Sequence, residues 1–354
     1  MNTFVYNGNP ARVIFGSGTV SRLGEEADRL GVKRLLVLST PEQEAQAREI
    51  AAHLGARVAG TYAKAQMHTP VEVTADAMQT VEQLGADAVV SIGGGSTTGL
   101  GKAIAFRTDL PQIVVPTTYA GSEATPILGE TEAGRKVTKS DPRILPEVIV
   151  YDVDLTLTLP LSLSVTSGIN AVAHAVEALY AAEANPIVSM MAQEGISAIT
   201  RALPLIQTDP QDRAARADAL YGAWLCGVCL GSVGMALHHK LCHTLGGMFN
   251  LPHAPMHTAV LPHAVAYNRD AAPEAMARLS KALGGGDPAI ALYDLADRLG
   301  ATMSLKDLGM PPDGVEAAVE QAMSNAYWNP RPLERAALKE LLERANTGER
   351  PTGD

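Results

Sequence analysis

To about residue 150, short apolar runs alternate with helix-length stretches in which apolar residues recur every three or four positions. Apolar runs bounded by glycine, proline or charged residues are typical of strands that are buried on both faces. The sequence predicts strands at 34–39, 87–96, 112–118 and 147–153, and helices at 42–55 and 74–85. This alternation predicts a doubly wound, Rossmann-like parallel sheet covered by helices.

The pattern changes at about Pro160, where Ala-, Leu- and Met-rich helical segments punctuated by prolines replace the strands. A chain of 354 residues is too long for one ordinary hydrophobic core, which favours two domains. We therefore expect an α/β domain over residues 1–157 and an all-helical domain over residues 158–354.

Composition narrows the classes of function. The chain is 46% hydrophobic and 19% charged, as folded globular proteins are, and its formal net charge of −10 argues against a nucleic-acid surface. No apolar run reaches the ~18 residues of a membrane helix, and the start, MNTFVYNGNP, does not resemble a signal peptide. We expect a cytoplasmic protein without nucleic-acid or membrane partners.

The cysteines add no chemistry to this picture. Cys226 and Cys229 have the C-x-x-C spacing of some zinc and redox sites, but they lie in an apolar helical stretch without a second such pair. We expect these two thiols and Cys242 to be buried packing residues.

A glycine-rich turn, SIGGGSTTGLGK at 91–102, follows a predicted strand and opens a predicted helix. Consecutive glycines let backbone N–H groups approach an anion, and a helix N-terminus favours negative charge. The spacing differs from the G-x-G-x-x-G and Walker patterns, so a turn without a ligand remains an alternative. The residues predicted to hold the phosphates of a nucleotide are Gly93, Gly94, Gly95 and Ser96.

A second polar turn, PTTYAGSEAT at 116–125, follows the next strand and strengthens the nucleotide prediction. Its hydroxyls belong to the same strand edge, where doubly wound sheets bind ligands: Thr117, Thr118, Ser122 and Thr125. The strand 34–39 ends at Ser39 without the carboxylate that would repel a 2′-phosphate, so we expect both NADH and NADPH to be used.

The candidate catalytic residues are concentrated in the second domain. Asn170 and His174 are four residues apart, which places both on one helix face. Segment 235–263 carries six of the nine histidines, of which His239 and His243 share a helix face and His253 follows a proline in a loop. A lone histidine is usually structural, and His238, His257 and His263 are open to that interpretation.

Together the GGGS turn, the PTT-x-AGSE-x-T turn, the N-x-x-x-H helix and the H-x-x-x-H…PH segment resemble the iron-containing, group III alcohol dehydrogenase family. The resemblance covers nearly the whole chain and implies that family's dehydroquinate synthase-like fold, a nicotinamide cofactor and a homodimer. It places the family's metal ligands, one Asp and three His, at Asn170, His174, His239 and His253. It also places His243 beside the nicotinamide and Lys136 near the cofactor ribose.

One residue departs from that pattern, because Asn170 stands where metal-dependent members have Asp. A neutral amide weakens the binding of a divalent ion, so we expect that no metal is required. With HHKLCHTLGG, LYAAEANPI and YWNPRP, this departure resembles the maleylacetate reductase branch. That branch reduces a carbon–carbon double bond conjugated to a ketone in a dicarboxylate produced during the degradation of aromatic compounds.

The resemblance implies roles for the pocket residues. Asn170, His174 and His239 would stabilise an enolate oxygen, and His243 or His253 would donate the proton. The substrate carboxylates need cations, for which Arg331 and Lys240 are candidates, with Tyr119 as a further binding residue. Each cation is also compatible with a solvated surface charge, and for Lys240 that interpretation is favoured.

Two other functions remain open. The first is a metal-dependent alcohol or aldehyde dehydrogenase in which Asn170 still ligates. The second is a catalytically silent relative that only binds nucleotide, which the retention of four pocket histidines disfavours.

Overall fold

The computed structural model describes residues 4–6, 8, 11–132, 135–324 and 326–352, without the side chains of Arg135 and Lys136. The chain divides into two compact units, Asn9–Leu159 and Pro160–Asp354, and the described residues before Asn9 group with the second unit. The first unit is α/β and the second is helical, as the sequence predicts.

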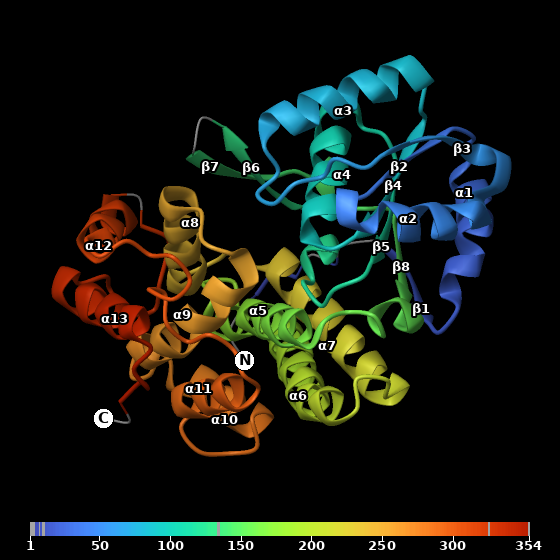
Figure 1. Cartoon of the computed structure of the whole chain (residues 1–354). Coiled ribbons are helices and arrows are strands. Elements are labelled where there is room, and N and C mark those ends of the chain that lie inside the picture. The colour runs from blue at the N-terminus through green and yellow to red at the C-terminus, as the bar shows by residue number, and fades with distance from the viewer. Residues whose placement is uncertain (1–3, 7, 9–10, 133–134, 325, 353–354) are drawn as a thin grey trace. The chain divides into compact units, whose positions relative to one another are not determined.

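The α/β unit contains a six-stranded, all-parallel sheet in the order β1-β8-β5-β4-β2-β3 (Figure 1). These strands are β1 (Arg12–Gly16), β2 (Leu35–Leu38), β3 (Val58–Tyr62), β4 (Ala88–Gly93), β5 (Gln112–Pro116) and β8 (Val148–Asp152). A separate antiparallel hairpin is formed by β6 (Ile127–Glu132) and β7 (Arg135–Ser140). The strand order reverses between β2 and β4, which is where sheets of this kind bind ligands.

Side chains along β2 point alternately to the two faces of the sheet, and each face is covered by its own layer of helices. Leu35 and Val37 pack into a core with α1 (Leu23–Leu30) and α2 (Glu44–Ala51). Leu36 and Leu38 pack into a second core with α3 (Val71–Leu84) and α4 (Gly95–Thr108). Because successive side chains of a strand point to opposite faces, a continuous apolar run is required to cover the sheet on both sides.

The predicted elements of this unit differ from the observed ones mainly at their ends. The strand predicted at 87–96 ends at Gly93, and the helix predicted at 42–55 contains the shorter α2 between two 3-10 turns. The sequence pattern missed β1 and β3, because these edge strands are only partly buried and have no continuous apolar run.

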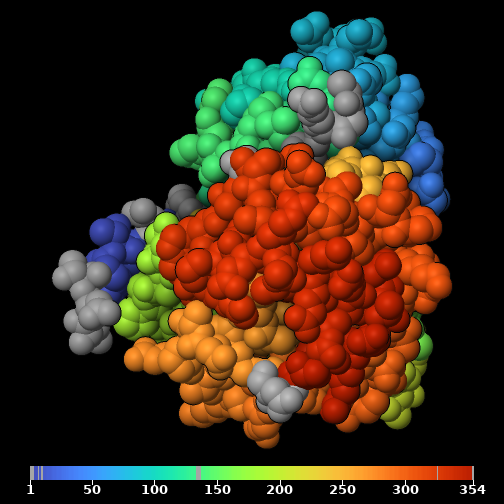
Figure 2. Space-filling view, turned by 90° about the vertical axis from the view of Figure 1, so that its left-hand side faces the viewer, coloured from blue at the N-terminus to red at the C-terminus, as the bar shows by residue number. Residues whose placement is uncertain are grey.

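The helical unit is built around α5 (Leu161–Tyr180), which is buried from Ser164 to Tyr180 and packs against α6, α7 and α9. The other helices are α6 (Pro186–Thr208), α7 (Arg213–Ser232), α8 (Leu237–Phe249), α9 (His253–Asn268), α10 (Pro273–Ala282), α11 (Pro288–Arg298), α12 (Gly314–Ser324) and α13 (Arg335–Thr347). The C-terminal segment, drawn in red, forms a continuous surface on one face of this unit (Figure 2). His253, predicted in a loop, is instead the first residue of α9.

The composition of α8 explains why its histidines face a pocket. Leu237, Leu241 and Leu245 recur every four residues and join a core with α9, α12 and α13. His239 and His243 are offset by two positions from this apolar stripe, which places them on the opposite side of the helix. The leucines therefore fix the direction in which these imidazoles point.

The three cysteines are buried and form no disulfide. An added Cβ on Gly195 of α6 would lie 2.9 Å from Cys226 Sγ on α7, so this thiol fills a close helix contact. Burial raises the pKa of Cys226, and it raises that of Cys229 to about 12. Both thiols are therefore poor nucleophiles at neutral pH.

Within the described part of the chain, no single helix has both the length and the apolarity needed to cross a membrane. Helices α7 and α8 meet those limits only as a pair, and they are bent by 96° at the break between them.

Candidate active site

The first candidate binding element is the N-terminus of α4, where Gly94 is the residue before the helix. A Cβ on Gly93 would lie 2.5 Å from Thr97 Oγ1, and a Cβ on Gly94 would lie 2.9 Å from Thr118 Cγ2. These two positions therefore require glycine for close packing of the turn. The free backbone N–H groups of the first helical turn suit a pyrophosphate.

The second polar turn lies directly against the first. Thr117 N donates to Gly93 O at 3.0 Å, and Gln43 Nε2 donates to Thr117 Oγ1 at 2.9 Å. The sequence analysis brought Gly93 and Thr117 together correctly but did not single out Gln43. Gln43 follows β2, Gly93 ends β4 and Thr117 follows β5, so the turns after these three strands contact one another.

Lys102 of α4 is hydrogen-bonded to the second polar turn. It is 1% exposed, and its Nζ donates to Ser122 O (2.5 Å), Thr125 O (2.7 Å), Thr125 Oγ1 (3.0 Å) and Ile127 O (3.0 Å). Burial lowers the pKa of Lys102 to about 7, against the opposing effect of Glu123. The Thr125 hydroxyl also donates to Ser122 O at 2.9 Å, so it is part of the internal structure of the turn.

The remaining cofactor candidates lie in the same unit. Ser39 follows β2, is fully buried, and has an Oγ without a hydrogen-bond partner among the described atoms. Glu42, three residues later, has a lowered pKa because its carboxylate accepts hydrogen bonds from its own backbone and from Thr40. Lys136 lies on β7, and its side chain is outside the described part of the structure.

Gly94 and Gly95 of the glycine-rich turn differ in the space around them. We expect Gly94→Ala to lower the free energy of unfolding by about 1–3 kcal/mol, because the new methyl group overlaps Thr118. Gly95→Ala is the matched control, because its Cβ would have only Ser122 Oγ nearby, at 3.9 Å. Thermal or urea unfolding of the two variants measures the difference, and equal stabilities would contradict it.

The second candidate site lies in the helical unit, between α5, α8 and α9. Asn170 and His174 of α5 and His239 of α8 are 2%, 4% and 2% exposed. The ring centroids of His174 and His239 are 5.2 Å apart. Asn170 Oδ1 and His239 Nε2 have no hydrogen-bond partner among the described atoms. Buried polar atoms of this kind are typical of a site that receives a ligand.

Glu177 of α5 organises this pocket. Its carboxylate accepts from Ala236 N (2.8 Å) and His238 N (2.6 Å) at the start of α8, and it pairs with His239 Nδ1 at 2.7 Å. Burial alone would raise the pKa of Glu177, but the His239 contact and the backbone donors outweigh it, so the pKa lies below its ordinary value. The buried anion therefore holds the His239 ring with Nε2 directed away from Glu177.

Two further histidines adjoin this group. His238 Nε2 lies 3.0 Å from His257 O, and the ring centroid of His257 is 4.9 Å from that of His238 and 4.2 Å from that of His253. Burial lowers the pKa of His238 to about 4 and that of His257 well below its ordinary value. Both are therefore neutral imidazoles near pH 7.

His243 and Lys240, also on α8, share Tyr327 as a neighbour. His243 Nδ1 lies 3.1 Å from Tyr327 Oη, and Lys240 Nζ lies 5.4 Å from the centre of the same ring. Lys240 is only 6% exposed, so the interpretation of this residue as a solvated surface charge is wrong. Burial lowers its pKa, and among described residues no carboxylate lies within 4.0 Å of its Nζ.

Arg331 has a different setting from Lys240. Its guanidinium lies 4.2 Å from the ring centre of Tyr267, and Nη1 donates to Tyr267 O at 3.3 Å. Its side chain is 38% exposed. In the other unit, Tyr119 is fully buried within the second polar turn.

The structure places Asn170 and His174 on one helix, as their spacing predicts, and His239 beside His174, as the family resemblance implies. Sequence reasoning missed Glu177 and Tyr327. Glu177 lies seven residues after Asn170 on the same helix face, so the i, i+4, i+7 series carried a signal for it. Tyr327 carried no such signal, because it reaches His243 from a segment 84 residues away.

Comparison with known proteins agrees with this fold. The family model for iron-containing alcohol dehydrogenase matches residues 10–153, and the model for the C-terminal part of that family matches residues 164–346. The chain belongs to the iron-containing alcohol dehydrogenase family.

Within that family, the chain is similar to several maleylacetate reductases. It is 57% identical to that of Rhizobium sp. strain MTP-10005, over 99% of this chain and 100% of the relative. It is 58% identical to that of Sphingobium indicum, over 98% of each chain. The crystal structure of maleylacetate reductase from Agrobacterium tumefaciens matches with a TM-score of 0.94 at 56% identity, covering 99% of this chain and all of the other.

The iron in the family name can be tested against the residues present. The imidazoles of His174, His239 and His253 fit a divalent ion in kind, because imidazole nitrogen binds metals of this class. The set lacks the family's anionic ligand, because Asn170 is a neutral amide and Glu177 contacts His239 and the backbone instead of occupying that ligand position. We therefore derive no catalytic step through a metal at these four positions.

Proposed function

We propose that this chain is an NAD(P)H-dependent reductase that converts maleylacetate to 3-oxoadipate in the degradation of aromatic compounds. The observation that carries the proposal is 57–58% identity to maleylacetate reductases over nearly the full length of both chains. We propose further that the reaction needs no metal, and the charge balance of the pocket supports this.

The chemistry suits a pocket without a strong Lewis acid. A bound nicotinamide supplies a hydride to the alkene carbon β to the ketone, and negative charge then develops on an enolate oxygen. An enolate is delocalised, whereas the reduction of a simple aldehyde produces a full alkoxide, for which a metal contributes more. Hydrogen-bond donors in a dry pocket are a sufficient source of stabilisation for the enolate.

Asn170 and His239 are the residues that we assign to this oxyanion. The side-chain amide of Asn170 supplies N–H donors and adds no negative charge to repel a dicarboxylate. His239 donates through Nε2 when it carries a second proton, and Glu177, 2.7 Å from Nδ1, stabilises that imidazolium. The same carboxylate keeps the ring in one orientation, so Nε2 is positioned before the substrate binds.

Completion of the reaction requires a proton on the carbon next to the ketone. His243 and His253 both remain candidates, because an imidazole donates protons near neutral pH. His243 Nδ1 lies 3.1 Å from Tyr327 Oη, which positions the His243 ring. His253 contacts His257 in the first turn of α9.

Lys240 is the cation that we assign to a substrate carboxylate. A buried ammonium without a carboxylate partner is unfavourable unless an anion pairs with it. A dianionic substrate supplies that anion, and Tyr327 covers one side of the charge. For Arg331, a role in binding the second carboxylate stays a prediction.

Lys240→Gln is therefore expected to raise the KM for maleylacetate, with kcat/KM falling about 10–100-fold, because a charge-assisted hydrogen bond is lost. The KM for NADH should not change. Steady-state kinetics measures both, and Lys281→Gln is the control, because Lys281 is an exposed lysine of the same unit. An unchanged KM for maleylacetate in Lys240→Gln would remove the assignment.

The function itself is tested by NADH oxidation with maleylacetate beside simple aldehydes, before and after dialysis against EDTA. We expect rapid turnover of maleylacetate that survives chelation, and little turnover of aldehydes. Activity that disappears on chelation and returns with Fe²⁺ or Zn²⁺ would instead favour a metal-dependent alcohol dehydrogenase. No turnover with either substrate class would favour a silent nucleotide-binding relative.

Other predictions accompany this function. Use of both NADH and NADPH follows from the absence of a carboxylate at Ser39, and a thousandfold preference for either would contradict it. The homodimer and the cytoplasmic location stay predictions.

A further inference from the structure

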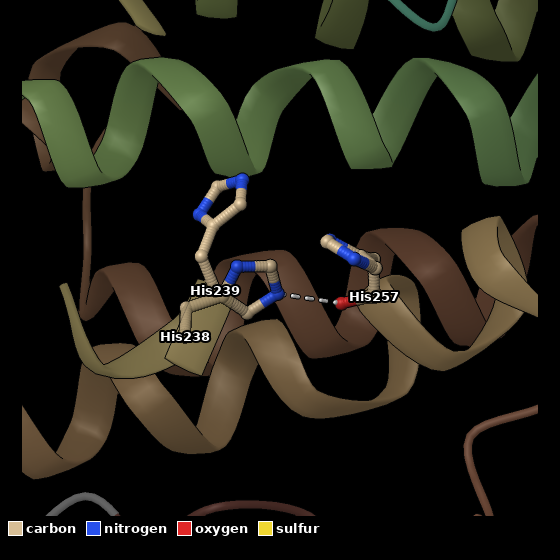
Figure 3. A group of neighbouring side chains, drawn as sticks. All are labelled: His238, His239 and His257. Atoms are coloured by element: carbon tan, nitrogen blue, oxygen red, sulfur yellow. Dashed lines mark hydrogen bonds between the residues drawn. The ribbon is translucent and has the colours of Figure 1, made fainter. Parts of the chain in front are cut away.

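Three histidines form a triplet that differs from the ligand set implied by the family. One ring nitrogen from each of His238, His239 and His257 lies within 4.8 Å of one from either neighbour. Their exposed fractions are 0%, 2% and 1%. Figure 3 shows two of these rings on one helix and the third on the helix beside it. Only His239 also belongs to the family set.

Hydrogen bonds fix the tautomers of two of these rings. Neutral His239 uses its Nδ1–H for Glu177 at 2.7 Å, and His238 uses its Nε2–H for His257 O at 3.0 Å (Figure 3). The lone pairs then lie on His239 Nε2 and His238 Nδ1, which have no hydrogen-bond partner among the described atoms. Neither ring nitrogen of His257 has one either. Metal-binding histidines typically have this arrangement, with the other N–H given to a carboxylate or carbonyl.

We propose that His238, His239 and His257 form a three-imidazole site for a borderline divalent ion such as Zn²⁺ or Co²⁺. Tetrahedral coordination at about 2.0–2.1 Å requires nitrogens about 3.4 Å apart, so small ring rotations close the site. Glu177, bonded to His239, places one negative charge directly behind the ion. A fourth position remains for water or another small ligand.

This site has a consequence for catalysis that rests on the proposed function. His239 Nε2 is needed both by the ion and by the enolate oxygen, so an ion bound by the triplet occupies the donor that the reaction uses. Zn²⁺ is therefore expected to inhibit maleylacetate reduction, and His257→Asn is expected to weaken that inhibition.

The direct test is titration of the EDTA-treated full-length protein with Co²⁺, followed by its visible d–d absorption. We expect one Co²⁺ per chain with the intense bands of tetrahedral coordination. His238→Asn and His257→Asn should each weaken binding by at least about tenfold, because each loses a direct ligand. His263→Asn is the matched control, because it removes a buried histidine of α9 outside the triplet.

His174→Asn and His253→Asn separate this site from the family set. If they abolish the bands while His238→Asn and His257→Asn do not, the ion uses the family positions and the proposal is overturned. Absence of tetrahedral bands in the wild-type protein overturns it as well. If the bands follow His238 and His257 but Zn²⁺ does not inhibit, the site stands and the assigned role of His239 in the reaction fails.

Discussion

Replacing Glu177 with glutamine is expected to lower kcat for maleylacetate by about 10²–10³-fold, which is the usual effect of losing one oxyanion donor. A neutral amide cannot stabilise a protonated His239, and its NH₂ group opposes the N–H donors at the start of α8. The KM for NADH should stay unchanged, because the glycine-rich turn proposed to bind the nucleotide belongs to the α/β unit. Steady-state kinetics with both substrates measures this split between kcat and KM.

Glu183→Gln provides the matched control for Glu177→Gln. Glu183 Oε2 accepts from Gly234 N at 3.1 Å, so it also holds the segment before α8, but it is exposed. A purely structural role for Glu177 would be indicated if both variants lost stability while kcat stayed near the wild-type value. If Glu177→Gln does not fold, Glu177→Asp takes its place, because aspartate keeps the charge and only shortens the side chain. We expect the folded fraction of Glu177→Asp to retain measurable kcat for maleylacetate.

The sequence was sufficient to predict the fold class because each of its signals is local. The continuous apolar run of β2 and the glycines at the start of α4 are read directly from neighbouring residues. The edge strands β1 and β3 were missed because partial burial removes the apolar run that identifies a strand. Tertiary contacts decided these two elements, and no periodicity in the sequence reports them.

The site was predictable only in part, for the same reason. Asn170 and His174 share a helix face, so spacing alone placed them together. Lys240 is buried, and its neighbour Tyr327 comes from a distant segment, so the local pattern did not report its surroundings and the surface interpretation failed. The spacing of Glu177 from Asn170 predicts that both lie on one helix face. The hydrogen bonds of Glu177 to the start of α8 depend on how two helices pack, which spacing does not report.

Lys102→Met is expected to have the largest effect on stability, lowering the free energy of unfolding by about 3–5 kcal/mol. The change leaves the carbonyl oxygens of Ser122, Thr125 and Ile127 without their donor, in a turn that is partly buried. It also removes the cation that faces Glu123, whose carboxylate accepts a hydrogen bond from Tyr151 Oη at 2.8 Å. Urea unfolding at a fixed pH measures the loss, and Lys139→Met, which breaks a partly exposed ion pair with Glu130, is expected to lose less than about 1 kcal/mol.

The loss in Lys102→Met should also depend on pH. Because burial lowers the pKa of Lys102 from 10.5 to about 7, the unfolded chain binds a proton between these values that the folded chain does not. Unfolding therefore takes up a proton in this window, and the stability of the wild-type protein rises with pH, by at most about 1.4 kcal/mol per pH unit. Methionine does not bind protons, so the stability of Lys102→Met gains nothing from this effect. The difference in free energy of unfolding between the wild-type protein and Lys102→Met should therefore grow from pH 7 towards pH 10. A deficit that is constant with pH would mean that the folded protein keeps Lys102 protonated, with its four oxygen acceptors and Glu123 compensating fully for burial.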